Sequence, residues 1–418
     1  MRIRALPESL PTSTSDFRAL LRHRSFVRFW VARLTGGFAN QMLAVAVGWQ
    51  VYALTGSALD LGLVGLVQFA PSVVLLLFVG HAADRYDRRW IVAICQTIEA
   101  GAATALAVMS LRGTITEHAI FALVALIGAA RAFTQPTTQT LLPSVVPAAL
   151  LPRAVAANAT AGQTAIVAGP ALGGFVYAAG PDAVYGLCAM FFVTAAALNL
   201  TLRVERRNVS RDPPTLESLF AGIAYIRRHR ALLGAISLDL FAVLLGGATA
   251  LLPIYARDIL DTGPLGLGFL RSAPAVGALT MAVWLAHHPL ERRAGRKMFL
   301  AVALYGVATM VFGVSRSFAL SLGALVVLGA CDMISVVVRT SLVQLRTPDE
   351  MRGRVSAVNF IFIGASNQLG EFESGVTAAW LGTVPAVVLG GVGTLVVAWL
   401  WMRGFKELAQ VDSLASAR

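Results

Sequence analysis

Polar and charged side chains interrupt the long apolar runs of this 418-residue sequence, and these interruptions are its best candidates for binding or proton transfer. Only 13% of the residues are charged, whereas 57% are hydrophobic. A charge at the centre of a membrane helix costs about 2.5–3.5 kcal/mol, so it usually faces a partner or a polar cavity. The side chains that we expect to line such a cavity or to carry a proton are Arg33, Asn40, Arg131, Asp239, Asp332, Arg339 and Glu371.

Helical spacing groups these candidates into stripes. Residues three, four or seven positions apart share one face of a helix. The three expected stripes are Arg33 with Gly37 and Asn40, Arg131 with Gln135 and Thr138, and Asp332 with Ser335 and Arg339. Two further charges, Glu99 and Arg271, are interpreted as structural.

Three of the candidates, Asp239, Asp332 and Glu371, are carboxylates. A carboxylate that alternates between dry and wet surroundings takes up and releases a proton, because burial disfavours its charged form. A static ion pair between helices would explain each of them equally well, and the doubt is greatest for Asp332 because Arg339 follows it on the same face. Glu371 and Glu373 lie about 200° apart around a helix. We therefore expect one of these glutamates to pair with an arginine on another helix.

A charged hairpin joins two membrane-length apolar runs. It contains Gly80, Asp84, Arg85, Arg88 and Arg89 within ten residues. The arginines alone would fit a simple topology signal. The glycine and the aspartate in the same segment favour a gate at the membrane surface.

The low charge and a mean hydropathy of +0.71 predict an integral membrane protein, since soluble domains carry about 25% charged residues. A spanning helix needs about 20 apolar residues, and lipid excludes open sheets. The apolar runs are also too long for the alternating strands of a barrel. The sequence predicts twelve helices, over residues 28–54, 59–82, 90–111, 117–140, 154–179, 183–203, 231–257, 264–287, 297–314, 317–342, 354–380 and 384–403.

The basic residues alternate with these helices. Arg112, Arg257 and Arg316 lie in loops on one side and four arginines lie inside helices, which leaves 27 of the 34 Lys and Arg residues on the other side. Cytoplasmic loops carry the excess of basic residues. We therefore expect a multi-pass protein of the inner (plasma) membrane with both termini in the cytoplasm.

An internal repeat divides the chain into halves. The segment from Arg153 to Asn158 recurs from Arg354 to Asn359, 201 residues later, and residues 169–174 align with 370–375 at the same offset. The hairpin has an incomplete counterpart at 291–297. Parallel repeats with a substrate between them are a known transporter plan. The expected units are a tail (1–27), a six-helix bundle (28–203), a linker (204–230), a second bundle (231–403) and a C-terminal tail (404–418).

Several other classes of protein fit poorly. The net charge of +12 is scattered over short loops rather than gathered in a patch, so no nucleic-acid partner is expected. Three widely spaced cysteines in apolar runs predict neither disulfides nor a metal site. No nucleotide-binding loop of the Gly-x4-Gly-Lys-Ser/Thr type occurs, and no cofactor is expected. The basic N-terminus lacks the apolar core of a signal peptide.

Twelve helices in a 6+6 repeat, with the Gly80 to Arg89 hairpin between helices 2 and 3, resemble the major facilitator superfamily over nearly the whole chain. Helix 5 carries Gly169, Pro170, Gly173 and Gly174, a pattern similar to that of proton-antiporting drug exporters. The stretches 239–253 and 351–355 look like the branch of enterobactin exporters and macrolide-efflux proteins. The resemblance implies that helices 1, 4, 7 and 10 line a central cavity.

The resemblance also implies roles for these motifs. The hairpin would lock the outward-open state, with Asp84 at the N-terminal end of helix 11, where the helix dipole favours an anion. Arg85, Arg88 and Arg89 would bridge to helix ends or to acidic lipid headgroups. The helix 5 glycines and Pro170 would shape a kink and allow close helix packing. An ordinary kinked membrane helix is the competing interpretation of that motif.

The resulting hypothesis is a secondary efflux transporter, not an enzyme, that acts as a monomer. It would exchange protons for a small molecule, a siderophore or an amphipathic drug-like compound, by alternating access. The alternatives are an importer or a lipid flippase of the same superfamily. A membrane enzyme or an assembly factor is a further alternative, although the dispersed charges favour a central pathway.

Overall fold

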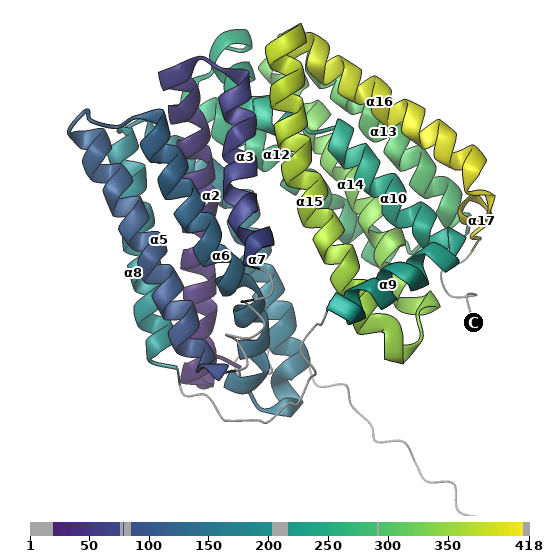
Figure 1. Cartoon of the computed structure of the whole chain (residues 1–418), viewed down its shortest axis with the longest axis horizontal. Helices are drawn as coiled ribbons and strands as arrows, with labels where there is room; N and C mark the ends of the chain where they lie inside the picture. Colours follow the sequence, from purple (N-terminus) through teal and green to yellow (C-terminus); the bar gives the residue numbers. More distant parts are fainter. Residues whose placement is uncertain (1–19, 76–77, 79–84, 203–215, 291, 413–418) are drawn as a thin grey trace, which may run out of the picture.

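The computed structural model describes residues 20–75, 78, 85–202, 216–290 and 292–412. Within these ranges the chain is almost entirely helical and forms no strand, as the sequence predicts. The helices gather in two groups that follow the two halves of the sequence (Figure 1). Gly80 and Asp84 of the charged hairpin lie outside the described residues.

The first half contains six long helices. The outer edge of this group is formed by α5 and α8 (Figure 1). The helices are α2 (Arg24–Thr55), α3 (Ala58–Val74), α5 (Arg88–Leu111), α6 (Glu117–Val145), α7 (Leu151–Tyr177) and α8 (Pro181–Leu200), with a short η1 (Ala148–Leu150) before α7.

The second half repeats this arrangement, with α13 and α16 at its outer edge (Figure 1). A linker helix, α9 (Leu216–Arg228), precedes it and packs on the beginning of α15. The long helices are α10 (Arg230–Leu245), α12 (Gly263–His287), α13 (Ala294–Val314), α14 (Phe318–Arg346), α15 (Asp349–Leu381) and α16 (Thr383–Gly404), followed by α17 (Lys406–Ala409).

Side chains near the turns explain several helix starts. Ser57 accepts a hydrogen bond from the backbone of Asp60 at 3.2 Å, and Thr116 caps α6 in the same way. Asp87 caps α5 by accepting from the backbone of Arg89 at 3.0 Å. The second hairpin lacks such a cap of its own. Instead, the C-terminal tail supplies Asp412, whose carboxylate accepts from the backbone of Arg293 at 2.9 Å.

By length and composition alone, eight of the described helical segments could span a membrane. The remaining long helices are α2, α7 and α15, with more polar or small residues, and α3, which is apolar but has only 17 residues. All four contact the opposite half of the molecule. The polar and small residues of α2, α7 and α15 thus occur on helices that pack against the other half.

The seventh spanning segment is broken, which corrects the continuous helix predicted over 231–257. After α10 the chain forms a 3-10 turn, η2 (Ala248–Leu251), one turn of α11 (Leu252–Ile254) and a π-helical turn, η3 (Tyr255–Ile259). Gly246 and Gly247 tolerate this break, and a Cβ on Gly247 would lie 2.7 Å from the Ser374 hydroxyl. Pro253, which follows these glycines, has no backbone N–H and so cannot donate a helical hydrogen bond there. Helix α3 ends at Val74, after Pro71, and most of the rest of the second predicted helix, up to residue 82, lies outside the described residues.

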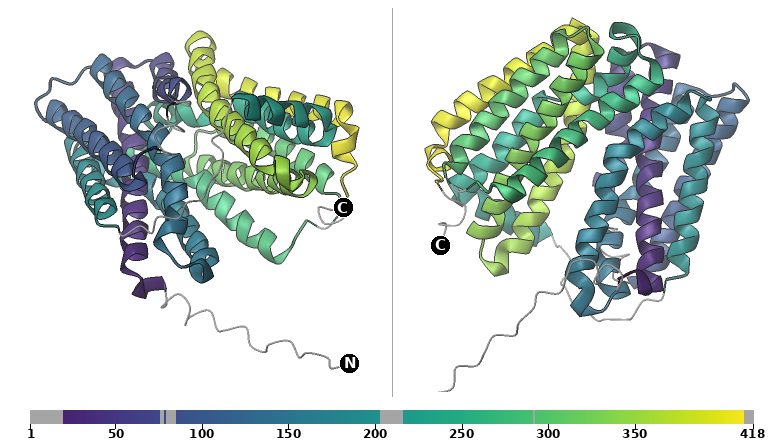
Figure 2. Two further views of the ribbon diagram at one scale, coloured as in Figure 1. Left: turned by 60° about the horizontal axis from the view of Figure 1, so that its bottom comes forward. Right: turned by 180° about the vertical axis from the view of Figure 1, so that it is seen from behind.

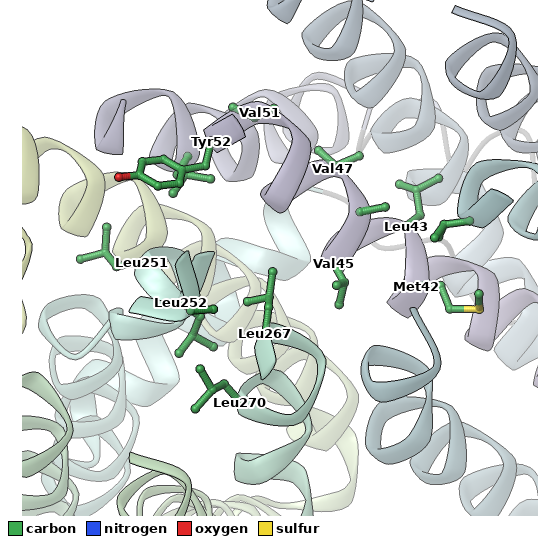
Figure 3. Packing of buried hydrophobic residues seen from close by; sticks show 14 of the residues in the cluster. Met42, Leu43, Val45, Val47, Val51, Tyr52, Leu251, Leu252, Leu267 and Leu270 are labelled. Carbon is green, nitrogen blue, oxygen red and sulfur yellow. The ribbon is translucent and has the colours of Figure 1, made fainter. Parts of the chain in front are cut away.

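The two halves meet at one end and separate at the other, which is visible from the front and from behind (Figure 1, Figure 2). We call the end with the turns before α3, α6, α8, α12, α14 and α16 the closed end, and the end where α2 begins and α16 ends the open end. One hydrophobic cluster spans both halves at the closed end and joins α2 residues such as Met42 and Val51 to Leu252 and Leu267 (Figure 3). Two other clusters lie one in each half, towards the open end.

Candidate functional site

Glycines bring α3 and α15 together across the closed end. A Cβ added to Gly62 would lie 3.0 Å from the Cα of Gly375, and one added to Gly65 would lie 2.5 Å from a carboxylate oxygen of Glu371. Backbones approach this closely only where side chains are absent. This crossing therefore joins the two halves through their smallest residues.

A second crossing joins α7 and α12. A Cβ on Gly268 would lie 2.6 Å from the carbonyl oxygen of Pro170, and one on Gly174 would overlap the carbonyl of Pro264. In contrast, Gly173 of the same motif packs on the backbone of Met42, and Gly169 packs on the side chain of Gln41, both on α2. The predicted helix 5 motif thus serves two contacts, one within its own half and one to the other half.

An aromatic and charged contact adds to the closed end, and the sequence analysis missed it. The Tyr52 hydroxyl on α2 donates a hydrogen bond to the Asp258 carboxylate of η3. Arg257 donates to the backbone oxygen of Tyr52 at 3.2 Å, and its guanidinium lies 5.5 Å from the centre of the tyrosine ring. The adjacent charges of Arg257 and Asp258 at the end of a helix could have indicated a polar contact. Their partner, Tyr52, could not be identified because it lies 205 residues before Arg257. We call these three residues the Tyr52 latch.

Opposite charges face one another just inside the closed end. Arg271 on α12 interacts electrostatically with Glu371 on α15. Its guanidinium also reaches the first half, 3.8 Å from where a Cβ on Gly48 would lie. Glu373 instead accepts a hydrogen bond from Thr377, one turn along α15, at 2.8 Å. Of the two glutamates, Glu371 is the one that interacts electrostatically with an arginine of another helix, although the two do not form an ion pair within 4.0 Å. Arg271 lies between the halves rather than at a peripheral site.

A basic cluster lies within the first half and consists of Arg33 on α2, Glu99 on α5 and Arg131 on α6. Glu99 is 1% exposed and attracts Arg131, which in turn repels Arg33. Neither arginine forms a hydrogen bond or an ion pair with another described residue. Asn40, from the same predicted stripe, donates to the backbone oxygen of Gly36 at 2.9 Å.

An acidic cluster occupies the corresponding part of the second half. Arg339 on α14 forms an ion pair with Asp239 on α10, and Ser335 donates to the same aspartate at 3.1 Å. The side chains of the pair are only 4% and 7% exposed. Asp332, the nearer acid in sequence, makes no such bond to Arg339. Asp239, not Asp332, is therefore the static ion-pair partner.

A pocket opens beside this acidic cluster, between α10, α13 and α14. It is lined by Asp239, Ala242, Val243, Val302, Tyr305, Cys331, Asp332 and Ser335. Among the described residues, no group of three or more His, Cys, Asp or Glu side chains is placed to hold a metal ion. The pocket brings two predicted proton-carrying candidates to one small space.

The described hairpin arginines hold the ends of helices in their own half. Arg89 donates to the backbone oxygen of Leu202 at 2.6 Å and pairs with Asp87 at 2.7 Å. Arg88 reaches the backbone oxygen of Thr140 at 3.5 Å. Arg85 is exposed. The bridging of arginines to helix ends is seen for Arg88 and Arg89, whereas the roles of Gly80 and Asp84 fall outside the described residues.

The sequence profile of the transmembrane secretion effector family, within the major facilitator superfamily, matches residues 14–418. The chain is 26% identical over 400 residues to the enterobactin exporter EntS of Escherichia coli O1:K1, covering 93% of this chain and 94% of EntS. It is 25% identical over 366 residues to the multidrug efflux pump Tap of Mycolicibacterium fortuitum, covering 83% and 87% of the two chains.

Solved structures show the same fold at low sequence identity. A mutant of the nucleoside transporter NupG matches with a TM-score of 0.73 and 14% identity, over 91% of this chain and all of that one. A bacterial homologue of the human lysosomal transporter Spinster, in an inward-facing and occupied conformation, matches with a TM-score of 0.72 and 13% identity, over 92% and 98% of the two chains.

Proposed function

Because the chain belongs to the transmembrane secretion effector family of the major facilitator superfamily, we propose that it is a secondary efflux transporter. It exports a small amphipathic compound in exchange for protons by alternating access and works as a monomer. The cargo resembles the siderophore or drug-like compounds named for EntS and Tap. The transporter resides in the inner (plasma) membrane.

One observation carries this proposal: in the described part of the chain, the closest contacts between the halves lie at one end, with charged side chains of both halves behind that contact. Glycine crossings and the Tyr52 latch hold the closed end, and they join α2, α3 and α7 to the second half. Rocking of one half against the other would exchange the open and closed ends. The two separate hydrophobic clusters near the open end are consistent with this movement, because they would approach each other when that end closes.

The proposal places the open end in the cytoplasm. The loops on that side carry 27 of the 34 Lys and Arg residues, and cytoplasmic loops are the basic ones. The observed arrangement is then the inward-facing state, ready to receive cargo from the cytoplasm. The charged hairpin, with Asp84 at the beginning of α15, would lock the opposite, outward-facing state.

Asp332 is the carboxylate that we assign to proton coupling. It lines the pocket between α10, α13 and α14, and it makes no hydrogen bond to a described residue. Asp239 forms an ion pair with Arg339, and Glu371 interacts electrostatically with the nearby Arg271. A carboxylate without such a partner loses its proton least easily when buried and most easily when water enters. Alternating wet and dry states of the pocket would therefore load and release the proton.

Everted membrane vesicles containing the full chain test the direction and the coupling. With an acidic vesicle interior, we expect accumulation of at least one of three probes, ethidium, 8-anilino-1-naphthalenesulfonate or 2,3-dihydroxybenzoate, and its loss on adding an uncoupler. Vesicles without the protein are the control. Accumulation of the probe that does not depend on the pH gradient would refute proton antiport. Uptake confined to right-side-out vesicles would indicate import, and movement of a fluorescent phospholipid alone would indicate a flippase.

Two variants separate coupling from gating. Asp332→Asn is expected to abolish gradient-driven accumulation while preserving exchange of probe across the membrane without a gradient. Asp84→Asn is expected to keep the protein folded but to bias it towards the inward-facing state. Full gradient-driven transport by Asp332→Asn would remove the coupling assignment, and normal transport by Asp84→Asn would remove the gate.

A further inference from the structure

Equivalent positions of the two halves carry opposite charges. Helix α2 begins at residue 24 and α10 at residue 230, and Arg33 and Asp239 are separated by the same 206 positions. Helix α6 begins at residue 117 and α14 at residue 318, and Arg131 and Asp332 are separated by the same 201 positions. Two arginines of the first half thus occupy the places of two aspartates in the second.

The hydrogen bonding of the two clusters also differs. In the acidic cluster, Asp239 is satisfied by Arg339 and Ser335. In the basic cluster, Glu99 is the one carboxylate among the described residues seen to attract Arg131, and the second guanidinium, Arg33, is repelled. The buried Nε of Arg33 and one buried carboxylate oxygen of Glu99 have no hydrogen-bond partner. The basic cluster therefore carries an unbalanced positive charge and unused donors.

Unused guanidinium donors inside a membrane protein are costly unless an anion or water meets them. Arginine forks bind carboxylate, sulfonate and phosphate oxygens with strong, directional hydrogen bonds. Arg33 lies on α2, which contacts α11 and α12 of the second half. Its helix therefore runs along the boundary between the halves rather than at the outer, lipid-facing edge formed by α5 and α8.

We infer that Arg33 and Arg131 bind an anionic group of the cargo, so that the transported compound is an amphipathic acid. The inference rests on the proposed function, because it takes the space between the halves as the path of the cargo. The two clusters then have separate tasks: the arginines of the first half hold the cargo, and the acids of the second half handle the proton.

A matched pair of fluorescent probes tests the inference by equilibrium binding. The probes are 8-anilino-1-naphthalenesulfonate and N-phenyl-1-naphthylamine, which share one ring system and differ in the sulfonate. Binding to the full chain in lipid nanodiscs is measured without any gradient, and the signal of empty nanodiscs is subtracted. We expect Arg33→Gln and Arg131→Gln each to raise the Kd of the sulfonate about tenfold and to leave that of the neutral probe unchanged.

Control variants separate a binding role from a structural one. Arg112→Gln removes an exposed arginine in a closed-end loop and should change neither Kd. Arg131→Lys retains the positive charge and should therefore bind the sulfonate more tightly than Arg131→Gln does. If Arg131→Gln does not elute as a single folded species, Arg131→Lys replaces it beside Arg33→Gln. An unchanged sulfonate Kd in Arg33→Gln and Arg131→Lys, or an equal loss for both probes, would overturn the inference.

The outcomes also separate this inference from the proposed function. Sulfonate binding that depends on both arginines, in a protein that fails to export in everted vesicles, would overturn efflux and support the anion site. Gradient-driven export of the sulfonate that is indifferent to both arginines would support efflux and overturn the anion site.

Discussion

The basic cluster of the first half and the acidic cluster of the second half occupy equivalent places in a duplicated fold, yet they are built differently. Glu99 attracts Arg131, which repels Arg33, and neither arginine forms a hydrogen bond with a described residue. In the second half, Asp239 and Arg339 form a buried ion pair. The comparison teaches that equivalent positions of the two halves carry charges of opposite sign with different bonding, which suits each half to a different task.

The largest expected effect follows from breaking the buried pair of the second half. Replacing one partner leaves the other charge uncompensated, which typically costs about 3–5 kcal/mol. We expect Arg339→Met to lower the melting temperature of the purified protein strongly and the double variant Asp239→Leu/Arg339→Met to recover most of the loss. Arg131→Met, at the equivalent cluster, should cost far less because its guanidinium has no described hydrogen bond to lose. An equal loss for Arg339→Met and Arg131→Met would contradict the contrast between the clusters.

The glycine crossing of α7 and α12 provides the next effect, which concerns how the two halves meet. A side chain at Gly174 would overlap the carbonyl of Pro264, and overpacking of this kind costs about 1–3 kcal/mol. Gly174→Val should therefore shift the protein away from the closed-end contact and reduce transport by tenfold or more. Gly162→Val is the matched control on the same helix, since a Cβ there meets nothing within 4 Å. Similar transport by the two variants would show that the crossing is unimportant.

The Tyr52 latch should contribute less, because it is one charge-assisted hydrogen bond in a partly exposed place. Tyr52→Phe removes the donor to Asp258 and should destabilise the closed end by about 1.5 kcal/mol. Distances between spin labels on the two halves, measured at the closed end, would report the shift. Tyr177→Phe, at a tyrosine of α7, is the control. A distance distribution in Tyr52→Phe that matches the control would remove the latch.

The smallest expected effect compares the two hairpins. The first hairpin caps α5 with its own Asp87, whereas the second relies on Asp412 from the C-terminal tail. Loss of such a cap costs about 0.5–2 kcal/mol, so Asp412→Ala should lower the melting temperature slightly. Truncation after Gln410 should cost more than Asp412→Ala, because it also removes the backbone oxygens of Val411 and Asp412 that accept from Gly295 and Ala294, and the buried Val411 side chain. An equal loss for the two variants would show that the side-chain cap alone accounts for the tail's contribution.

Particular residues show where sequence reasoning stopped. Arg339 lies on the same helical face as Asp332, and that spacing made a static pair more of a concern for Asp332 than for Asp239 or Glu371. The structure pairs Arg339 with Asp239 because α10 and α14 pack side by side, a contact between residues 100 positions apart. The Tyr52 latch and the role of Arg271 were hidden for the same reason. Spacing along one helix predicts which residues share a face, but it does not predict which helix lies opposite.

The sequence by itself determined the membrane class, the helical fold and the family, because these follow from hydropathy, loop charges and local motifs along the chain. It also placed the polar residues on the correct helices. Only the tertiary structure decided which end is closed, that Gly174 faces the other half while Gly173 faces its own, and which charges pair. These features depend on how far and at what angle helices approach one another, and that geometry arises from packing across the whole molecule.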